Sequence, residues 1–180
     1  MKNMFIDIYE IEPGGIPVAA DLGLGDRVDE DDILLEIGTT RIRGRAVPGP
    51  RGVDLRAHLE STARLRCSRC LEPFDWSVSV DFALILVPEA TEFAAGEAQV
   101  TELDASLFYC PGGKADLAGI AMEQINLGLP LKPVCDPECR GLCATCGGNR
   151  NEIECGCREE SIDPRLAPLM ELKKKSRDGV

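Results

Sequence analysis

Aromatic residues are scarce in this chain of 180 residues: they make up 4% of it, with a single Trp. Hydrophobic residues still reach 44%, so the sequence predicts a buried core built mainly from aliphatic side chains. No window approaches the roughly 18 apolar residues that a membrane span requires, and residues 1–10 lack the apolar stretch of a signal peptide. We therefore expect a cytoplasmic protein with no membrane partner.

Histidine is scarcer still, because His58 is the single one in the chain. A catalytic zinc keeps an open coordination position and usually recruits His or a carboxylate, and His58 is far in sequence from the cysteines. Gly112-Gly113-Lys114 lacks the rest of a phosphate-binding loop, and no carboxylate spacing singles out a general acid and base. We therefore expect no enzymatic activity and no small-molecule substrate.

Positive charge is in short supply overall, since the formal net charge is −11. It is concentrated in one region, because residues 41–70 carry a net charge of +6. An acidic total argues against a protein that coats nucleic acid non-specifically. It leaves room for a local basic face.

Cysteine, in contrast, is abundant. Six of the nine cysteines lie between Cys135 and Cys157, and Cys67 and Cys70 lie far upstream. Thiols stay reduced in the cytoplasm, so this cluster favours metal ligation over disulfides. Pairs of cysteines in tight turns suit a tetrahedral zinc site, and Gly147 after Cys146 permits the positive φ that closes such a turn.

The spacing favours two zinc sites, although a single site or another pairing stays open. Our preferred partition places Cys67, Cys70, Cys135 and Cys139 in one site and Cys143, Cys146, Cys155 and Cys157 in the other. Cys110 is left over as a lone thiol. Two alternatives to structural zinc are a redox dithiol at Cys67 and Cys70 and an iron–sulfur cluster on the C-x3-C-x2-C spacing that starts at Cys139.

Alternating apolar residues predict β-strands along most of the first 90 residues. The expected strands cover residues 4–9, 33–37, 42–47, 53–67 and 77–87, with a hairpin turn at 38–40, a second turn at 48–52 and loops at 13–32 and 88–106. Helical spacing with an Asp116 N-cap predicts one helix near residues 115–128, and a short C-terminal helix is expected within 162–175.

The expected fold is therefore α+β: a mainly antiparallel sheet, with barrel-like curvature as an option, one packed helix, a zinc-ribbon-like C-terminal module and a short terminal helix. We expect residues 1–131 to form the sheet domain and residues 132–180 the cysteine-rich module with its tail. In this interpretation Cys67 and Cys70 pin the module to the sheet.

Six arginines alternate along two of the expected strands and form a candidate RNA-binding stripe. They are Arg41, Arg43, Arg45, Arg56, Arg64 and Arg66. If the polar faces coincide across the 48–52 turn, Arg43 lies near Arg56. The alternative is a solvated face whose arginines pair with the abundant carboxylates.

Several segments, in this order and spacing, resemble the bacterial YceD family, also called the large ribosomal RNA subunit accumulation protein family. They are LRCSRCLEPF (65–74), INLGLPLKPVC (125–135), C-x3-C-R-G-L-C-x2-C-G-x-N (135–149), C-x-C (155–157) and DPRLAPL (163–169). The resemblance covers most of the chain, and residues 13–32 are its least distinctive part.

The resemblance implies a cytoplasmic, non-enzymatic factor in ribosome biogenesis that supports accumulation or processing of large-subunit ribosomal RNA. It implies the eight clustered cysteines as ligands, and as partner either the precursor of that RNA or a basic ribosomal protein. A thiol or zinc redox sensor is the alternative function, and an iron–sulfur protein is a further one.

Overall fold

The computed structural model describes residues 5–28, 33–88 and 106–157. The chain falls into two units: the first contains residues 1–68 and 72–135, and the second contains residues 69–71 and 136–180. The second unit is therefore assembled from two separate segments. The expected division at residue 131, with Cys67 and Cys70 as the link, stays a prediction.

Three long antiparallel strands form the centre of the first unit. They are β4 (Thr40–Pro48), β5 (Val53–Arg66) and β6 (Pro73–Val87). Every odd-numbered residue of β5 is buried, and every even-numbered one is exposed or half-buried. This period-two pattern is what a strand covered on one face requires, and it confirms the strand and the turn expected there.

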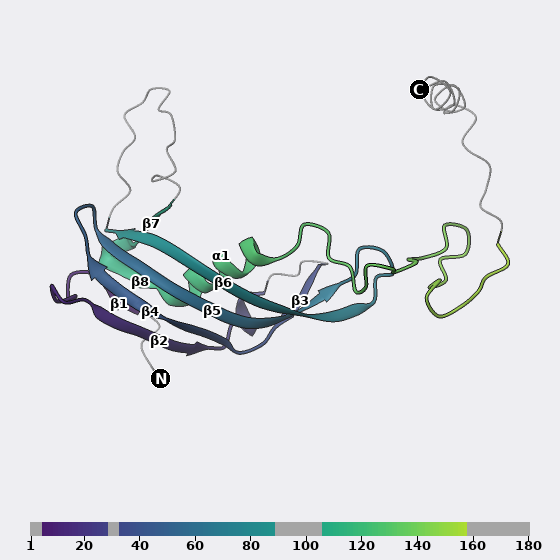
Figure 1. The fold of residues 1–180 in the computed structure, drawn as a ribbon, viewed down its shortest axis with the longest axis horizontal. Coiled ribbons are helices and arrows are strands. Elements are labelled where there is room, and N and C mark those ends of the chain that lie inside the picture. The colour runs from purple at the N-terminus through teal and green to yellow at the C-terminus, as the bar shows by residue number, and fades with distance from the viewer. Residues whose placement is uncertain (1–4, 29–32, 89–105, 158–180) are drawn as a thin grey trace, which may run out of the picture. The chain divides into compact units, whose positions relative to one another are not determined.

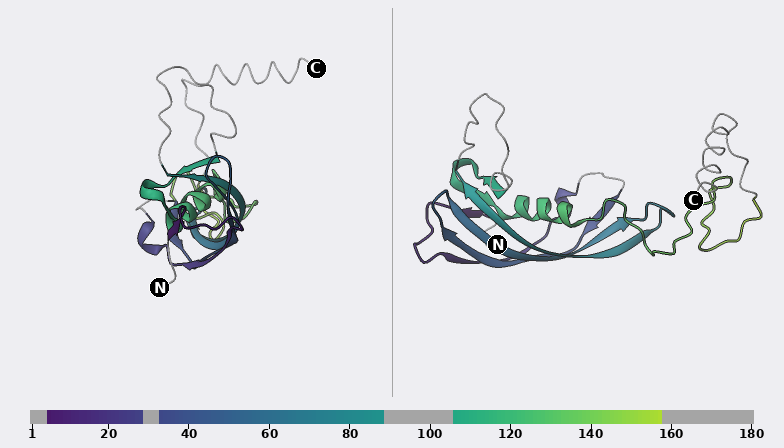
Figure 2. Two further views of the ribbon diagram at one scale, coloured as in Figure 1. Left: turned by 90° about the vertical axis from the view of Figure 1, so that its left-hand side faces the viewer. Right: turned by 45° about the horizontal axis from the view of Figure 1, so that its top comes forward.

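Three shorter strands extend the sheet: β2 (Ile16–Leu22) pairs with β4, β3 (Leu34–Ile37) pairs with β5, and β7 (Leu107–Tyr109) pairs with β6. The hairpin expected at residues 38–40 is therefore wrong, because β3 pairs with β5 and not with the strand β4 that follows it. The β6–β7 pair is parallel, and the other pairs within the described residues are antiparallel. Figures 1 and 2 show the sheet of the first unit curled around its helix like half of a barrel. The expected antiparallel, barrel-like α+β fold is confirmed.

The strand β2 lies where we expected a loop, at residues 13–32, and that expectation is wrong. Its apolar residues are buried in alternation: Val18, Ala20 and Leu22 are each at most 5% exposed. Pro17 is compatible with this position because β2 is an edge strand, where one N–H can be lost from the ladder. Pairing with β4 decides the structure here more than local propensity does.

The helix α1 (Leu117–Gly128) packs against the buried face of the sheet, mainly on β6. Its N-cap is Asp116, as predicted, and the Asp116 carboxylate accepts a hydrogen bond from the Ala118 N–H at 3.0 Å. The helix starts two residues later than expected because β8 (Lys114–Asp116) pairs with β1 (Phe5–Asp7) in a separate two-stranded sheet.

The buried core of the first unit is aliphatic, as the composition predicts. The fully buried members are mainly Leu, Ile, Val and Ala, while Phe74, Phe82 and Phe108 pack against them from partly exposed positions. No helix within residues 5–28, 33–88 and 106–157 is long and apolar enough to cross a membrane. The short helix expected within residues 162–175 lies outside the described residues.

Candidate metal centres and the arginine-bearing sheet face

Eight cysteines lie in two groups of four, and these are the groups that the spacing favours. The sulfur atoms within each group lie within 4.8 Å of one another. Four thiolates at about 2.3 Å from a zinc ion would lie about 3.8 Å apart, so each group could hold a metal ion. The groups are Cys67, Cys70, Cys135 and Cys139, and Cys143, Cys146, Cys155 and Cys157.

A tight turn presents the first two sulfurs of the second group. The Gly147 N–H donates to the Cys143 carbonyl at 2.9 Å, and the Cys143 N–H donates to the Gly148 carbonyl at 2.8 Å. Gly147 has φ of 71°, the left-handed conformation expected for the residue that closes such a turn. Glycine is needed at this position for its backbone conformation and not for lack of space, because a Cβ there would meet no atom within 4 Å.

The turn also makes the four sulfurs of the second group chemically unequal. Backbone N–H groups of Cys146 and Thr145 point at the Cys143 sulfur and lower the pKa of Cys143 to about 6. A hydrogen bond between Cys157 and the Cys146 sulfur raises the pKa of Cys157 to about 12. The sulfurs therefore compete for protons, and a metal that binds all four as thiolates releases protons as it binds.

The hairpin between β5 and β6 places Cys67 and fixes the chain around Cys135. The Cys67 N–H donates to the Glu72 carbonyl at 2.9 Å, and both the N–H and the hydroxyl of Ser68 donate to the Pro133 carbonyl. The Cys135 N–H in turn donates to the Cys67 sulfur at 3.4 Å. A backbone N–H aimed at a thiolate stabilises its charge and orients it toward a metal.

Two residues of the second unit hold the chain around Cys139. The Arg69 guanidinium donates to the carbonyls of Pro137 and Cys139, each at 3.0 Å. The Asn151 side-chain amide donates to the Cys139 sulfur at 3.3 Å, and we did not single out Asn151 from the sequence. The asparagines that follow the Cys143 turn were the available signal, because amides commonly support metal ligands.

Cys110 belongs to neither group. It is fully buried in the core of the first unit, and burial raises the pKa of its thiol to about 11. None of the nine cysteines, all of which lie in the described residues, forms a disulfide bond. Cys110 is thus an inert core residue, which agrees with its assignment as a lone thiol.

The β4–β5 register decides how the six arginines lie on the exposed face of the sheet. Arg45 is paired with Arg56, and Arg43 is paired with His58. Arg43 therefore lies near Arg56, as expected, but diagonally across the strands and not directly opposite it. The difference arises because the hairpin pairs Pro48 with Val53, which leaves four residues between the strands.

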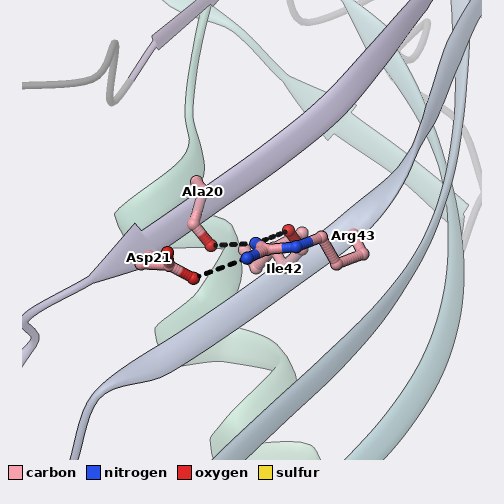
Figure 3. A network of polar contacts seen from close by, with 4 residues as sticks. All are labelled: Ala20, Asp21, Ile42 and Arg43. Carbon is pink, nitrogen blue, oxygen red and sulfur yellow. Dashed lines mark hydrogen bonds and ion pairs between the residues drawn. The ribbon is translucent and has the colours of Figure 1, made fainter.

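Arg43 is held within its own sheet rather than free to reach a ligand (Figure 3). Its guanidinium donates to the Ala20 carbonyl at 2.9 Å and to the Ile42 carbonyl at 2.8 Å, and forms an ion pair with Asp21 at 2.8 Å. Arg41 faces Glu60 and Asp21 across the strands, and Arg64 faces Glu36 and Asp75. Half of the stripe thus lies beside carboxylates.

His58 extends this mixed-charge surface onto β6. Its Nδ1 lies 2.8 Å from the Asp81 carboxylate and its Nε2 lies 3.6 Å from Glu60. The hydrogen bond with Asp81 is the main reason why the pKa of His58 is raised. The imidazolium therefore persists to higher pH than in a free histidine, and it serves as a surface ion-pair partner.

The Arg45–Arg56 pair is the exception on this face, because two like charges lie directly opposite each other. Arg45 donates to the Gly14 carbonyl, and both side chains are exposed. Arg66, at the end of β5, is half-buried and paired with Pro73. Within the described residues, the structure therefore divides the predicted stripe into arginines that face carboxylates across the strands and a pair, Arg45 and Arg56, that face each other.

The fold and these groups define a curled β-sheet protein with two four-cysteine groups that could each bind a metal ion. The family described as large ribosomal RNA subunit accumulation protein YceD matches residues 55–173. The chain belongs to this family. The matched region contains β5 from Leu55 onward, β6, α1 and all eight clustered cysteines.

Relatives support this assignment over part of their lengths. The chain is 28% identical over 181 residues to large ribosomal RNA subunit accumulation protein YCED homolog 1, chloroplastic, of Zea mays. This match covers 84% of this chain and 59% of the relative. The chain is 37% identical over 109 residues to an uncharacterized protein of Mycobacterium tuberculosis strain H37Rv, which covers 59% of this chain and 48% of the relative. No solved structure matches the chain.

Proposed function

We propose that this chain is a non-enzymatic factor that supports the accumulation of large-subunit ribosomal RNA, acts in the cytoplasm and is stabilised by zinc. The observation that carries the proposal is the family match over residues 55–173, which includes the two cysteine groups. The names of the maize and Arabidopsis thaliana relatives support the same role. The partner would be precursor RNA or a basic ribosomal protein.

Zinc is the metal that the donor set favours. Both groups offer four thiolates and neither includes a histidine or a carboxylate. Sets of four cysteines usually form closed structural zinc sites, whereas catalytic zinc keeps a position for water or substrate. This donor chemistry supports a stabilising metal and a protein without catalytic activity.

Depletion of the protein from its host tests the proposed role. We expect the amount of mature large-subunit ribosomal RNA to fall relative to small-subunit RNA, and the protein to sediment with large-subunit precursors in a sucrose gradient. Re-expression of the wild-type chain should restore the ratio. An unchanged RNA ratio, with the protein found in the free fractions alone, would contradict the proposal.

Direct RNA contact through the arginine face stays a prediction. The β4–β5 register shows which two arginines to substitute, because it places Arg45 directly opposite Arg56. The double substitution Arg45→Gln with Arg56→Gln should weaken binding to a large-subunit RNA fragment and reduce the slope of log K against log salt by about 1 to 2, because two phosphate contacts are lost. Fluorescence anisotropy at several salt concentrations measures this slope.

The matched control is Arg41→Gln with Arg64→Gln, which changes the net charge equally at positions that face carboxylates. We expect the control to keep most of the slope. Equal effects of both double variants would mean that net charge alone matters, and no effect of either would assign the arginines to the solvated face.

A further inference from the structure

Within the part of the chain that the structure describes, the strand β6 is paired along one edge and open along most of the other. Its pairing with β5 runs without interruption from Leu86 to Pro73. On the opposite edge, β7 covers only Ile85 to Val87. Among the described residues, no other strand or backbone group pairs with β6 between Phe74 and Leu84. The open edge is therefore about twice as long as a typical strand of five to six residues.

The backbone groups of the odd-numbered residues point out of this edge. The Val87 carbonyl accepts from the Cys110 N–H on the β7 side, whereas the Glu72 carbonyl accepts from the Cys67 N–H on the β5 side. Alternation along the strand then directs the N–H and C=O of five residues outward. They are Asp75, Ser77, Ser79, Asp81 and Ala83, and all five are exposed.

This edge lacks most of the features that prevent a further strand from pairing. Proteins protect open edges with charged side chains, lysine above all, and with proline or bulges. Between Phe74 and Leu84 there is no proline, lysine or arginine, and the β5–β6 register contains no bulge. The edge is therefore a geometrically regular template for strand addition.

The charge of the edge indicates which strand it accepts. Its charged side chains are Asp75 and Asp81, which face Arg64 and His58 of β5, and the Asp81 side chain is 89% exposed although it pairs with His58. A second copy of this chain, with a net charge of −11, would bring like charges together. An extended segment rich in lysine or arginine would bring opposite charges to the same positions.

Exposed apolar side chains lie on β6 and at the end of α1, the helix that packs on β6. A Cβ on Gly128 would lie 2.8 Å from the Val80 side chain, which places the end of α1 against β6. Leu127 and Leu131, on either side of Gly128, are 73% and 99% exposed, and Trp76 of β6 is 38% exposed. An added strand with alternating apolar residues could cover part of this surface.

We propose that the open edge of β6 binds an extended segment of a basic polypeptide as an added β-strand. The backbone of the segment would pair with the odd-numbered residues from Asp75 to Ala83, and its basic side chains would face Asp75 and Asp81. The proposal rests on the proposed function and names its partner class: a basic polypeptide of the kind that itself binds ribosomal RNA.

Amide hydrogen exchange followed by NMR tests the edge in the full-length protein. In the free protein, the amides of Val78 and Val80 should exchange slowly because they pair with β5, and those of Ser77, Ser79 and Asp81 should exchange rapidly. The probe peptide acetyl-Lys-Val-Lys-Val-Lys-Val-Lys-Val-amide should slow the second set at least tenfold. The same peptide, N-methylated along the edge that would pair with β6, should not slow the exchange of these amides.

Three outcomes would overturn the proposal. Slow exchange of Ser77, Ser79 and Asp81 in the free monomer would mean that the chain covers its own edge. Slow exchange that depends on protein concentration would mean that a second copy pairs there. Protection of these amides by an RNA oligonucleotide, but not by the peptide, would assign the surface to nucleic acid.

The substitution Ser79→Pro removes one outward N–H without touching the β5 ladder, and Ser79→Ala is its matched control. We expect Ser79→Pro to lower peptide affinity at least tenfold and Ser79→Ala to leave it unchanged. If Ser79→Pro does not fold, the N-methylated peptide on the wild-type protein decides the question. Rescue of ribosomal RNA levels by a folded Ser79→Pro chain would overturn the edge proposal while the proposed function holds.

Discussion

Replacement of Cys143 with serine is expected to lower the zinc content of the purified protein by one ion per chain, from two. Cys143 is the buried sulfur of the second group, and the backbone N–H groups of its turn lower the pKa of its thiol to about 6. Zinc affinity in small modules is folding free energy of about 10 kcal/mol or more, so we also expect its surroundings to unfold. Metal analysis by mass spectrometry and limited proteolysis measure both effects.

The control for this prediction is Cys110→Ala, which removes a thiol that belongs to neither group. We expect it to keep both ions, although it removes a buried side chain. Two ions in the Cys143→Ser protein would show that the division of the cysteines into these groups is wrong. If the purified wild-type protein contains iron with labile sulfide, the zinc hypothesis is wrong and the iron–sulfur alternative holds.

Substitution of Gly44 by alanine is expected to destabilise the sheet by about 3 kcal/mol, the upper end of the usual cost of overpacking. A Cβ at Gly44 would lie 2.5 Å from the Ala57 Cβ and 2.6 Å from its Cα, and would also collide with the Arg56 carbonyl. These are mostly backbone atoms of the neighbouring strand, so β4 and β5 would have to separate. Thermal unfolding followed by circular dichroism should show a loss of about 10 °C.

Gly14→Ala is the matched control, because a Cβ at that position would meet no atom within 4 Å. We expect it to change stability by less than about 0.5 kcal/mol. A Gly44→Ala protein as stable as this control would mean that β4 and β5 do not approach each other as closely as the register requires.

The central strands could be predicted because one sheet face is buried along their whole length, and burial of alternate residues leaves a period-two pattern in β5. The strands β2, β7 and β8 could not be predicted equally well. Two of them have three residues each, and β2 combines Pro17 with small alanines, so their structure depends on pairing with distant segments.

The cysteine groups were accessible to sequence reasoning because thiols cluster for few reasons in a reducing compartment. The contacts around them were not, since Asn151 meets the Cys139 sulfur only once the chain has turned. The arginine stripe shows the same limit: alternation indicates a shared face, but the sequence does not tell which carboxylates accompany Arg43.

The composition of the second unit from two chain segments has a consequence for the order of folding. Arg69 lies at the tip of the β5–β6 hairpin, and its guanidinium bonds to carbonyls 68 and 70 residues further along. During synthesis the β5–β6 hairpin can form well before Pro137 and Cys139 leave the ribosome. The later contact with Arg69 then closes a long loop, and the entropic cost of loop closure rises only slowly with loop length. The C-terminal segment alone therefore lacks residues 69–71 of its own unit. We expect the second unit to fold last, and its C-terminal segment not to fold when it is excised from the chain.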